Sequence, residues 1–343
     1  MRIAVASGDR VTAEALRRAV LSDPLHSVAW FARDGAEAVA LCLSDSPDVL
    51  LLDPLVPGVS AVELTRRVMK EAPCAILLVT PKGANVGPVY DALSLGALDV
   101  AAAPSMDLEG ELSGHSPLLA RLASVERLVV KRSPSQPLPN LLSPPVPFSL
   151  TSPAPLVAIG ASTGGPAALA TILERVPKDL AAAIVIVQHI DEGFAEGLAS
   201  WLSDRTGFPV ASAVAGDVPR AGRGYLAATG QHLVMAADRS LVYVSEPAEH
   251  LHKPSVDVFF TSLAASPSPG LALLLTGMGR DGADGLLKLR RAGWMTVAQD
   301  AKTSVVNGMP RAAVDLGAAE LVLPVDAMAS TISGFAARVS RRR

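Results

Sequence analysis

The sequence is 343 residues long, which is enough for about two domains of ordinary size. Half of the residues are hydrophobic, so each domain can bury a core, and a net charge of −3 gives no argument for binding to nucleic acid or to an anionic membrane. The two cysteines, Cys42 and Cys74, form no metal-binding pattern or disulfide framework, which suits a reducing cytoplasm. The first residues lack the pattern of a signal peptide and no apolar run reaches the length of a membrane span, so we expect a cytoplasmic protein with no membrane insertion.

The N-terminal part alternates short apolar runs with helical patterns. One helix is expected from Thr12, a second contains "AVELTRRVMK", and a third closes this part at residues 116–132. The apolar runs lie at residues 3–6, 48–53, 75–80 and 98–104. Because such alternation is typical of parallel strands joined by right-handed crossovers, it predicts a doubly wound α/β sheet.

The segment that follows is rich in proline, with eight prolines among residues 133–155. Proline at this density disfavours both helix and central strand, and it favours an extended tether. We therefore predict a first domain at residues 1–132, a linker at residues 133–154 and a second domain at residues 155–343.

The C-terminal part shows the same alternation, with near-continuous apolar runs at residues 156–160, 182–188 and 271–277. Runs of this kind are typical of parallel strands that helices cover on both faces, so they predict a mainly parallel, three-layer α/β domain. Residues 223–246 instead alternate in polarity, with turn signals near residues 229–230 and 237–240. They predict an antiparallel hairpin.

Ser162 lies on a sharp corner between the first of these strands and a helix. The surrounding "GASTG" fits the G-x-S-x-G pattern of a nucleophile elbow, which leaves the serine hydroxyl exposed, and Pro166 suits the first helical turn. Backbone N–H groups at that helix start are suited to stabilise an oxyanion. The alternative is a glycine-rich turn whose serine has no role. Phosphate-binding loops are disfavoured, because the stretch lacks both G-x-G-x-x-G and a Gly-Lys-Ser/Thr sequence.

A nucleophilic serine needs a general base, and His189 is the best placed of the six histidines. It ends the apolar run "AIVIVQ", at the carboxyl end of a predicted strand. The other histidines lie in the N-terminal part or in segments without that placement: His26, His115, His232, His250 and His252. The last two form a His-x-His pair, but no third ligand follows, so we predict no metal site.

The third member of a catalytic triad would be a carboxylate that orients the imidazole. Asp281 lies in a glycine-rich loop after the run 271–277, and Asp284 is a rival in the same loop. A helix cap or a turn is the alternative role for either aspartate. Ser162, His189 and Asp281 all follow predicted parallel strands, where open α/β sheets bind ligands. Their order along the chain differs from that of the α/β-hydrolases.

The C-terminal part resembles the catalytic domain of the chemotaxis protein-glutamate methylesterases. The matching stretches cover almost all of residues 155–335: "IGASTGGP", "VQHI", "KPSVDVFFTSLA", "LLTGMGRDGADG" and "VVNGMPRAA". The resemblance implies a carboxylic-ester hydrolase that removes methyl esters from glutamates of methyl-accepting chemotaxis receptors and often deamidates receptor glutamines, without a cofactor. It places the triad on Ser162, His189 and Asp281. The Met278 backbone amide then serves the oxyanion hole, and Thr163 follows the nucleophile.

The N-terminal part resembles a (βα)5 response-regulator receiver that has lost some of its functional residues. Asp53 falls on the phosphoacceptor and Thr80 on the switch hydroxyl. The acidic pair that binds Mg²⁺ is replaced by Ser7 and Gly8, with only Asp9 beyond, and Ala103 stands where a lysine belongs. A chemotaxis histidine kinase is the implied partner, but without these groups we expect Asp53 to be phosphorylated slowly or not at all.

Two other functions compete with this interpretation. The first is a scaffold that kept the fold and lost catalysis, and the intact Ser162, His189 and Asp281 argue against it. The second is an esterase or amidase that acts on other proteins or on small molecules in a chemosensory-like pathway. Methanol release from methylated receptors separates this second function from receptor demethylation.

Overall fold

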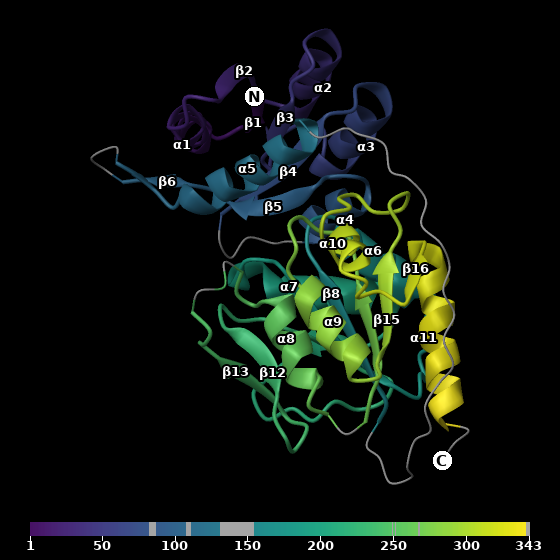
Figure 1. The fold of residues 1–343 in the computed structure, drawn as a ribbon. Helices are drawn as coiled ribbons and strands as arrows, with labels where there is room; N and C mark the ends of the chain where they lie inside the picture. The colour runs from purple at the N-terminus through teal and green to yellow at the C-terminus, as the bar shows by residue number, and fades with distance from the viewer. Residues whose placement is uncertain are drawn as a thin grey trace. The chain divides into compact units, whose positions relative to one another are not determined.

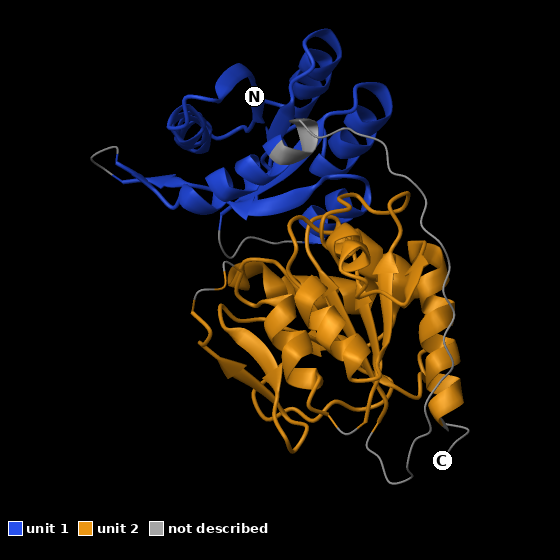
Figure 2. Ribbon diagram, in the orientation of Figure 1, with its two compact units in different colours: residues 1–134 blue, residues 135–343 orange. Residues whose placement is uncertain are grey.

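A computed structural model describes residues 1–81, 87–107, 111–130, 154–248, 250, 252–266 and 268–340 (Figure 1). The chain forms two compact units, Met1–Pro134 and Ser135–Arg343 (Figure 2). The division falls within the predicted linker, which lies outside the described residues except for Ala154, so its extended conformation stays a prediction. None of the helices in the described ranges is both long enough and apolar enough to cross a bilayer.

The first unit is a five-stranded parallel sheet in the order β2-β1-β3-β4-β5. Its main elements are β1 (Arg2–Ala6), α1 (Arg10–Leu21), β2 (Ser27–Ala32), α2 (Gly35–Ser44), β3 (Val49–Leu52), α3 (Ala61–Glu71), β4 (Ala75–Thr80), α4 (Gly87–Ser94), β5 (Asp99–Ala102) and α5 (Ser116–Val130). Helices α1 and α5 pack on the side chains of Ile3, Val5 and Leu51, while α2, α3 and α4 pack together. The predicted (βα)5 fold is confirmed.

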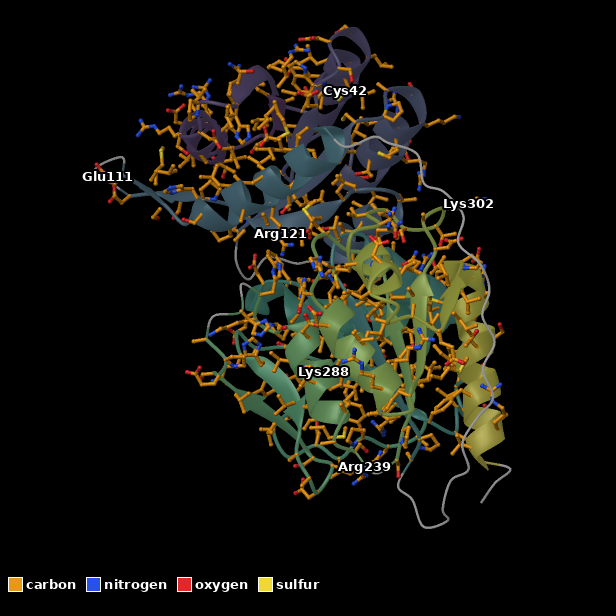
Figure 3. All side chains as sticks on the ribbon, in the orientation of Figure 1. Cys42, Glu111, Arg121, Arg239, Lys288 and Lys302 are labelled. Carbon is orange, nitrogen blue, oxygen red and sulfur yellow. The ribbon has the colours of Figure 1, made fainter. Side chains whose placement is uncertain are left out.

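Two details of the first unit differ from the sequence-based expectation. Helix α1 begins at Arg10 rather than Thr12, because Asp9 caps it by accepting a hydrogen bond from the Thr12 N–H. Strand β2 and a short hairpin, β6 (Ser105–Met106) and β7 (Leu112–Ser113), were not among the predicted strands. Helix α5 is joined to β5 by an ion pair between Arg121, labelled in Figure 3, and Asp99 at 2.8 Å.

The second unit contains a seven-stranded sheet in the order β10-β11-β9-β8-β14-β15-β16, in which every pair of neighbours is parallel. The strands of this sheet are β8 (Leu156–Ala161), β9 (Ala183–Gln188), β10 (Val210–Ser212), β11 (Gly224–Leu226), β14 (Leu271–Leu274), β15 (Met295–Gln299) and β16 (Leu321–Leu323). Strands β12 (His232–Met235) and β13 (Leu241–Val244) form a separate two-stranded sheet. The helices of the second unit are α6 (Gly165–Arg175), α7 (Glu192–Thr206), α8 (Val256–Leu263), α9 (Ala283–Arg291), α10 (Met309–Asp315) and α11 (Val325–Ser340).

Helices cover both faces of this sheet, as the apolar runs predicted. Figure 1 shows α8, α9 and α10 on one face, where Phe259 and Leu286 pack against Ala158 and Val185 of the central strands. Helices α6, α7 and α11 pack together on the opposite face. The central strands β8 and β9 are buried along their whole length, and the three-layer α/β architecture is confirmed.

The predicted hairpin at residues 223–246 is correct only in its second half. Strands β12 and β13 pair antiparallel, and their turn lies at residues 236–240, where Arg239 has a φ of 70°. Residues 224–226, in contrast, form β11, which runs parallel between β9 and β10. Three residues are too few to distinguish an alternating strand from a fully buried one, and β11 is buried throughout.

The order of the strands determines where a ligand can bind. The chain leaves β8 towards β9 and β11 on one side, and later returns to the other side of β8 with β14. Loops that follow β8 and β14 therefore diverge to opposite faces of the sheet, and open α/β sheets bind their ligands at the carboxyl edge where such a divergence occurs. The segments that carry Ser162 and Asp281 are these two loops.

Candidate active site

Ser162 lies directly after β8, in a turn that hydrogen bonds close. The Ser162 N–H donates to the Thr276 carbonyl at 3.0 Å, and the Gly165 N–H donates to the Ser162 carbonyl at 2.7 Å. Gly164 adopts the left-handed conformation, with a φ of 78°, and lets α6 start at Gly165. The predicted corner is present, and the Ser162 residue as a whole is only 4% exposed.

Close packing from β14 explains why Ser162 is buried. A Cβ atom added to Gly277 would lie 2.7 Å from the Cβ of Ser162, so only glycine allows this approach. Thr276 supports the same contact, because its hydroxyl donates to the Thr163 carbonyl at 2.9 Å. The nucleophile turn and the loop after β14 are thus held together by backbone contacts.

His189 follows β9 and lies beside Ser162. The register pairs Ala161 of β8 with Gln188 of β9, so the next residue on each strand is a site residue. The His189 N–H donates to the Ala161 carbonyl at 3.0 Å, which extends the ladder by one bond. The two side chains therefore come from neighbouring positions at the same edge of the sheet.

Asp281 binds His189 directly. The His189 Nε2 atom lies 2.7 Å from Asp281 Oδ2, and the imidazole is 2% exposed. The same carboxylate accepts three further hydrogen bonds at the start of α8, from the Ser255 hydroxyl and from the N–H groups of Val256 and Asp257. The rival Asp284 is exposed in the first turn of α9. The structure brings Asp281, and not Asp284, to the histidine.

The surroundings of Asp281 keep it ionised. Burial by itself would raise the pKa of this carboxyl, but the hydrogen bonds from His189, from the Ser255 hydroxyl and from the backbone N–H at the start of α8 outweigh burial. The pKa of Asp281 therefore lies below its ordinary value, as expected for a carboxylate at a helix N-terminus. A carboxylate only accepts hydrogen bonds, so the proton between the two residues is carried by His189 Nε2.

This tautomer leaves the other ring nitrogen of His189 free to accept a proton. Among the described residues, the buried Nδ1 atom has no hydrogen-bond partner. A neutral imidazole with its proton on Nε2 is a base at Nδ1. The arrangement can therefore take a proton from a neighbouring hydroxyl, which is the task of the base in a Ser-His-Asp triad.

The predicted oxyanion residues lie on the two segments that meet at Ser162. Thr163 follows the serine at the start of α6, and Met278 follows Gly277, which packs on the serine. A Cβ added to Gly308 would meet the Met278 Cα at 3.1 Å, so the loop before α10 closes over this segment. The assignment of the Thr163 and Met278 amides as oxyanion donors stays a prediction.

Comparison with known proteins identifies the family to which the chain belongs. The sequence model of the CheB methylesterase family matches residues 157–332. The chain is 44% identical, over all of both chains, to a "Protein-glutamate methylesterase/protein-glutamine glutaminase 4" from Burkholderia thailandensis. It is also 44% identical to a relative of the same description, numbered 2, from Cupriavidus metallidurans, with 96% of each chain covered.

The chain belongs to the CheB methylesterase family. Among solved structures, the catalytic domain of the Thermotoga maritima CheB methylesterase is 32% identical, with a TM-score of 0.51. That match covers 54% of this chain and 99% of the other. The resemblance inferred from the motifs is confirmed.

Sequence reasoning missed two residues that hold this CheB site together. Gln188 donates from its Nε2 atom to the carbonyls of both Ser162 and His189, at 2.9 and 3.0 Å. Ser255 caps α8 and also donates to Asp281. A serine that directly precedes the helical pattern "VDVFFTSL" was the signal for the cap, but nothing local indicated its bond to the carboxylate.

The His-x-His pair contacts two different histidines. The His252 ring stacks on His189, with 4.1 Å between ring centroids and 17° between the planes. The His250 ring meets His232 edge-on, with centroids 5.8 Å apart. His232 is fully buried, and burial lowers its pKa. In the described ranges, no group of three or more His, Cys, Asp and Glu side chains is arranged to hold a metal ion.

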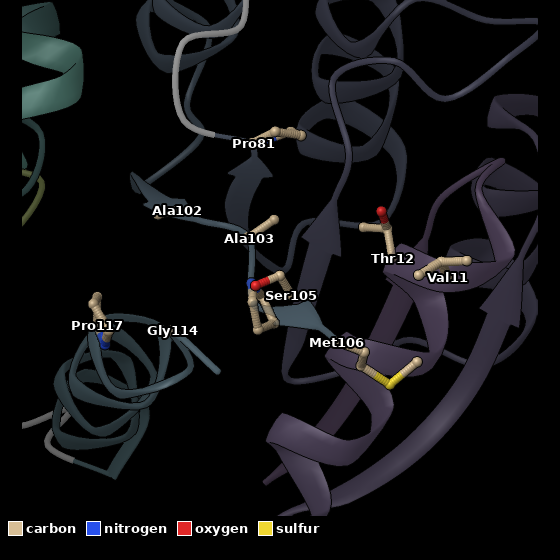
Figure 4. A pocket seen from close by; sticks show the side chains of 10 residues that line it. Val11, Thr12, Pro81, Ala102, Ala103, Ser105, Met106, Gly114 and Pro117 are labelled. Carbon is tan, nitrogen blue, oxygen red and sulfur yellow. The ribbon is translucent and has the colours of Figure 1, made fainter. Parts of the chain in front are cut away.

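The receiver-like unit of this CheB relative has a reduced acceptor site. Asp53 is 6% exposed, and its Oδ2 atom accepts a hydrogen bond from the Ser7 hydroxyl at 2.8 Å. The Asp9 carboxylate instead caps α1, and its hydrogen bonds from the Thr12 side chain and backbone lower its pKa. Ala103 lines an open pocket with Val11 and Thr12, at the position expected for a lysine (Figure 4).

These residues do not fit a bound Mg²⁺. The ion prefers several oxygen ligands in a near-octahedral arrangement, usually with more than one carboxylate or phosphate group. Here a serine hydroxyl hydrogen-bonds the one carboxylate at the centre of the site, and Asp9 is engaged in helix capping. Ala103 offers no cation for a phosphoryl group.

Proposed function

We propose that this protein hydrolyses the methyl esters of glutamate side chains on chemotaxis receptors and deamidates receptor glutamines, with Ser162, His189 and Asp281 as its catalytic triad. Membership of the CheB methylesterase family supports the substrate class. One observation supports the mechanism: Asp281 binds His189 Nε2, and the Nδ1 atom of the same ring is left without a hydrogen-bond partner among the described residues, so it can act as a base.

The first half of the reaction forms an acyl-enzyme. His189 Nδ1 takes the proton of the Ser162 hydroxyl as Oγ attacks the ester carbonyl carbon. The imidazolium that forms is stabilised by Asp281 through the Nε2–H bond. The tetrahedral oxyanion collapses, methoxide leaves with the proton from Nδ1, and methanol is released. The glutamyl group remains as an ester on Ser162.

The second half of the reaction uses water in place of the serine. His189 Nδ1 takes a proton from the water as its oxygen attacks the glutamyl ester, and Ser162 leaves with that proton. The product is a free glutamate carboxylate. A glutamine follows the same route, with ammonia as the first leaving group. Backbone N–H groups of Thr163 and Met278 would receive the oxyanion in both halves.

Methanol release from purified methylated receptors tests the substrate assignment. We expect steady release of methanol, accompanied by one new carboxylate for each methanol molecule, and ammonia when the receptor carries glutamine at the same sites. Receptor that has not been methylated is the control and should yield no methanol. Hydrolysis of short soluble esters without any release from receptors would show that the protein acts on other substrates.

We also propose that the receiver-like unit is either a docking module for chemotaxis partners such as a histidine kinase or a constitutively set module, and that it does not switch by rapid phosphorylation. Phosphoryl transfer to a carboxylate brings anionic groups together and depends on a cation to neutralise them. Neither the Ser7 hydroxyl nor the Ala103 methyl group supplies charge for that purpose. The chain therefore lacks both the acidic pair that would bind Mg²⁺ and the lysine that would pair with the phosphoryl group. The loss of both supports this proposal more strongly than the loss of either one alone.

Incubation with Mg²⁺ and a small phosphodonor tests the proposal about the receiver-like unit. We expect no gain of one phosphoryl mass in the intact protein, whereas Ser7→Asp combined with Ala103→Lys should gain it at Asp53. Asp53→Ala in that double variant is the control and should abolish the gain. Rapid Mg²⁺-dependent modification of the unaltered protein, with a rise in the esterase rate, would overturn the proposal.

A further inference from the structure

The stacked contact between His252 and His189 has no part in the triad chemistry described above. The two rings lie nearly parallel, 17° apart, with 4.1 Å between centroids. At this distance the faces of the two imidazoles are in van der Waals contact. One face of the catalytic ring is therefore covered by another planar ring.

The catalytic ring needs support beyond Asp281. That carboxylate binds only the Nε2 atom. By itself, this hydrogen bond does not fix the tilt of the ring about the Nε2–Oδ2 direction. Such a tilt would move Nδ1, at the opposite edge, away from Ser162. Misplacement of a reacting atom by about 1 Å can cost roughly a hundredfold in rate. A flat surface against the ring opposes this tilt, whereas the single hydrogen bond does not.

His252 is well placed to act as that surface because its own segment is anchored. Three residues later, the Ser255 N–H donates to His232 Nδ1 at 3.1 Å, and the Ser255 hydroxyl donates to Asp281 at 2.8 Å. The stacking ring and the cap that holds the carboxylate therefore belong to one short segment before α8. This segment positions both the carboxylate and the face of His189.

We propose that His252 is a positioning residue, which holds the His189 imidazole in the plane that directs Nδ1 towards Ser162. The proposal rests on the role of His189 as general base in the proposed function. A planar ring is the property that matters, because the contact is face to face. Replacement by another flat ring should preserve it, and replacement by an aliphatic side chain of similar size should not.

Steady-state kinetics on methylated receptors and on a short methyl ester test this role. For His252→Ala we expect kcat to fall about 10-fold to 100-fold on both substrates, with KM changed less than about twofold. His252→Phe should keep kcat within about threefold of the unaltered protein, whereas His252→Leu should stay as low as His252→Ala. Lys302→Ala, an exposed residue outside this segment, is the control and should leave kcat unchanged.

A second readout follows the His189 ring without turnover. In the Ser162→Ala background, we expect NMR to show the Nε2–H proton bonded to Asp281 as a single sharp signal. Adding His252→Ala or His252→Leu should broaden this signal by exchange, and adding His252→Phe should not. Because no catalysis is needed, this result is independent of whether receptors are the substrate.

Three results would overturn the proposal. The first is equal kcat values for the Leu and Phe variants. The second is an unchanged Nε2–H signal in the Ala variant. The third is a change confined to KM on receptors, which would make His252 a substrate contact. If His252→Ala does not fold, the comparison of Leu with Phe still decides the question.

Discussion

Ser162→Ala should remove nearly all methyl-ester hydrolysis while the protein keeps its fold. The hydroxyl oxygen is the atom that forms the acyl-enzyme, and alanine has no substitute for it. In well-studied serine hydrolases, loss of the nucleophile lowers kcat by about 10⁴-fold to 10⁶-fold, and we expect a loss in that range. The turn itself is held by backbone bonds of Ser162 and Gly165, which alanine retains. Methanol release and thermal unfolding are the measurements.

Further variants make this result specific to the triad. His189→Ala should cost a similar factor, and the double variant should lose little more, because triad members act as a unit. Ser330→Ala is the matched control, since that serine is exposed on α11 and its hydroxyl donates to the Ala327 carbonyl of the same helix. Methanol release by Ser162→Ala at the rate of the unaltered protein would exclude Ser162 as the nucleophile.

Asp281→Asn should lower kcat by about 10⁴-fold, as expected when the orienting carboxylate of a triad is lost. An asparagine that keeps its oxygen towards Ser255 and Asp257 presents an NH₂ group to His189 Nε2. The imidazole must then accept at Nε2 and carry its proton on Nδ1. A protonated Nδ1 cannot take the proton of Ser162. The Val256 N–H also loses its acceptor, so some loss of stability of about 1–3 kcal/mol should accompany the loss of rate.

Asp284→Asn is the matched control for this substitution. The side chain is exposed in the first turn of α9, where a negative charge contributes only about 0.3–1 kcal/mol through the helix dipole. We expect methanol release to stay within about twofold, since the residue does not contact His189. A damaging Asp284→Asn together with a harmless Asp281→Asn would reverse the assignment. Thermal unfolding of both variants separates lost catalysis from lost fold.

The sequence alone was sufficient to predict the central strands of both sheets and to single out Ser162 and His189 as candidate site residues. Runs such as residues 156–160 and 182–188 are buried on both faces, so their composition is dictated by their surroundings at every position. The strand-to-helix corner at Ser162 has a local cause, because it needs Gly164 in a left-handed conformation. His189 was found by its place at the end of such a run.

Several other features depend on contacts that no local pattern records. The two aspartates of the glycine-rich loop have the same local signals, and only the meeting of this loop with the start of α8 selects Asp281. Strand β11 was misread because three residues carry too little periodicity, and its parallel pairing comes from β9. In the receiver-like unit, the bond from Ser7 to Asp53 joins residues 46 positions apart.

The division between the two kinds of feature has a physical reason. Strand, helix and turn preferences depend on neighbours within a few residues, so the sequence was enough to predict the doubly wound units, the strand-to-helix corner at Ser162 and the position of His189 at the end of a strand. The role of a polar side chain instead depends on which partner approaches it in space. His250 and His252 are two positions apart in one segment, yet one contacts His232 and the other contacts His189. Only the tertiary structure, which brings the segment before α8 against the end of β9, decided that difference.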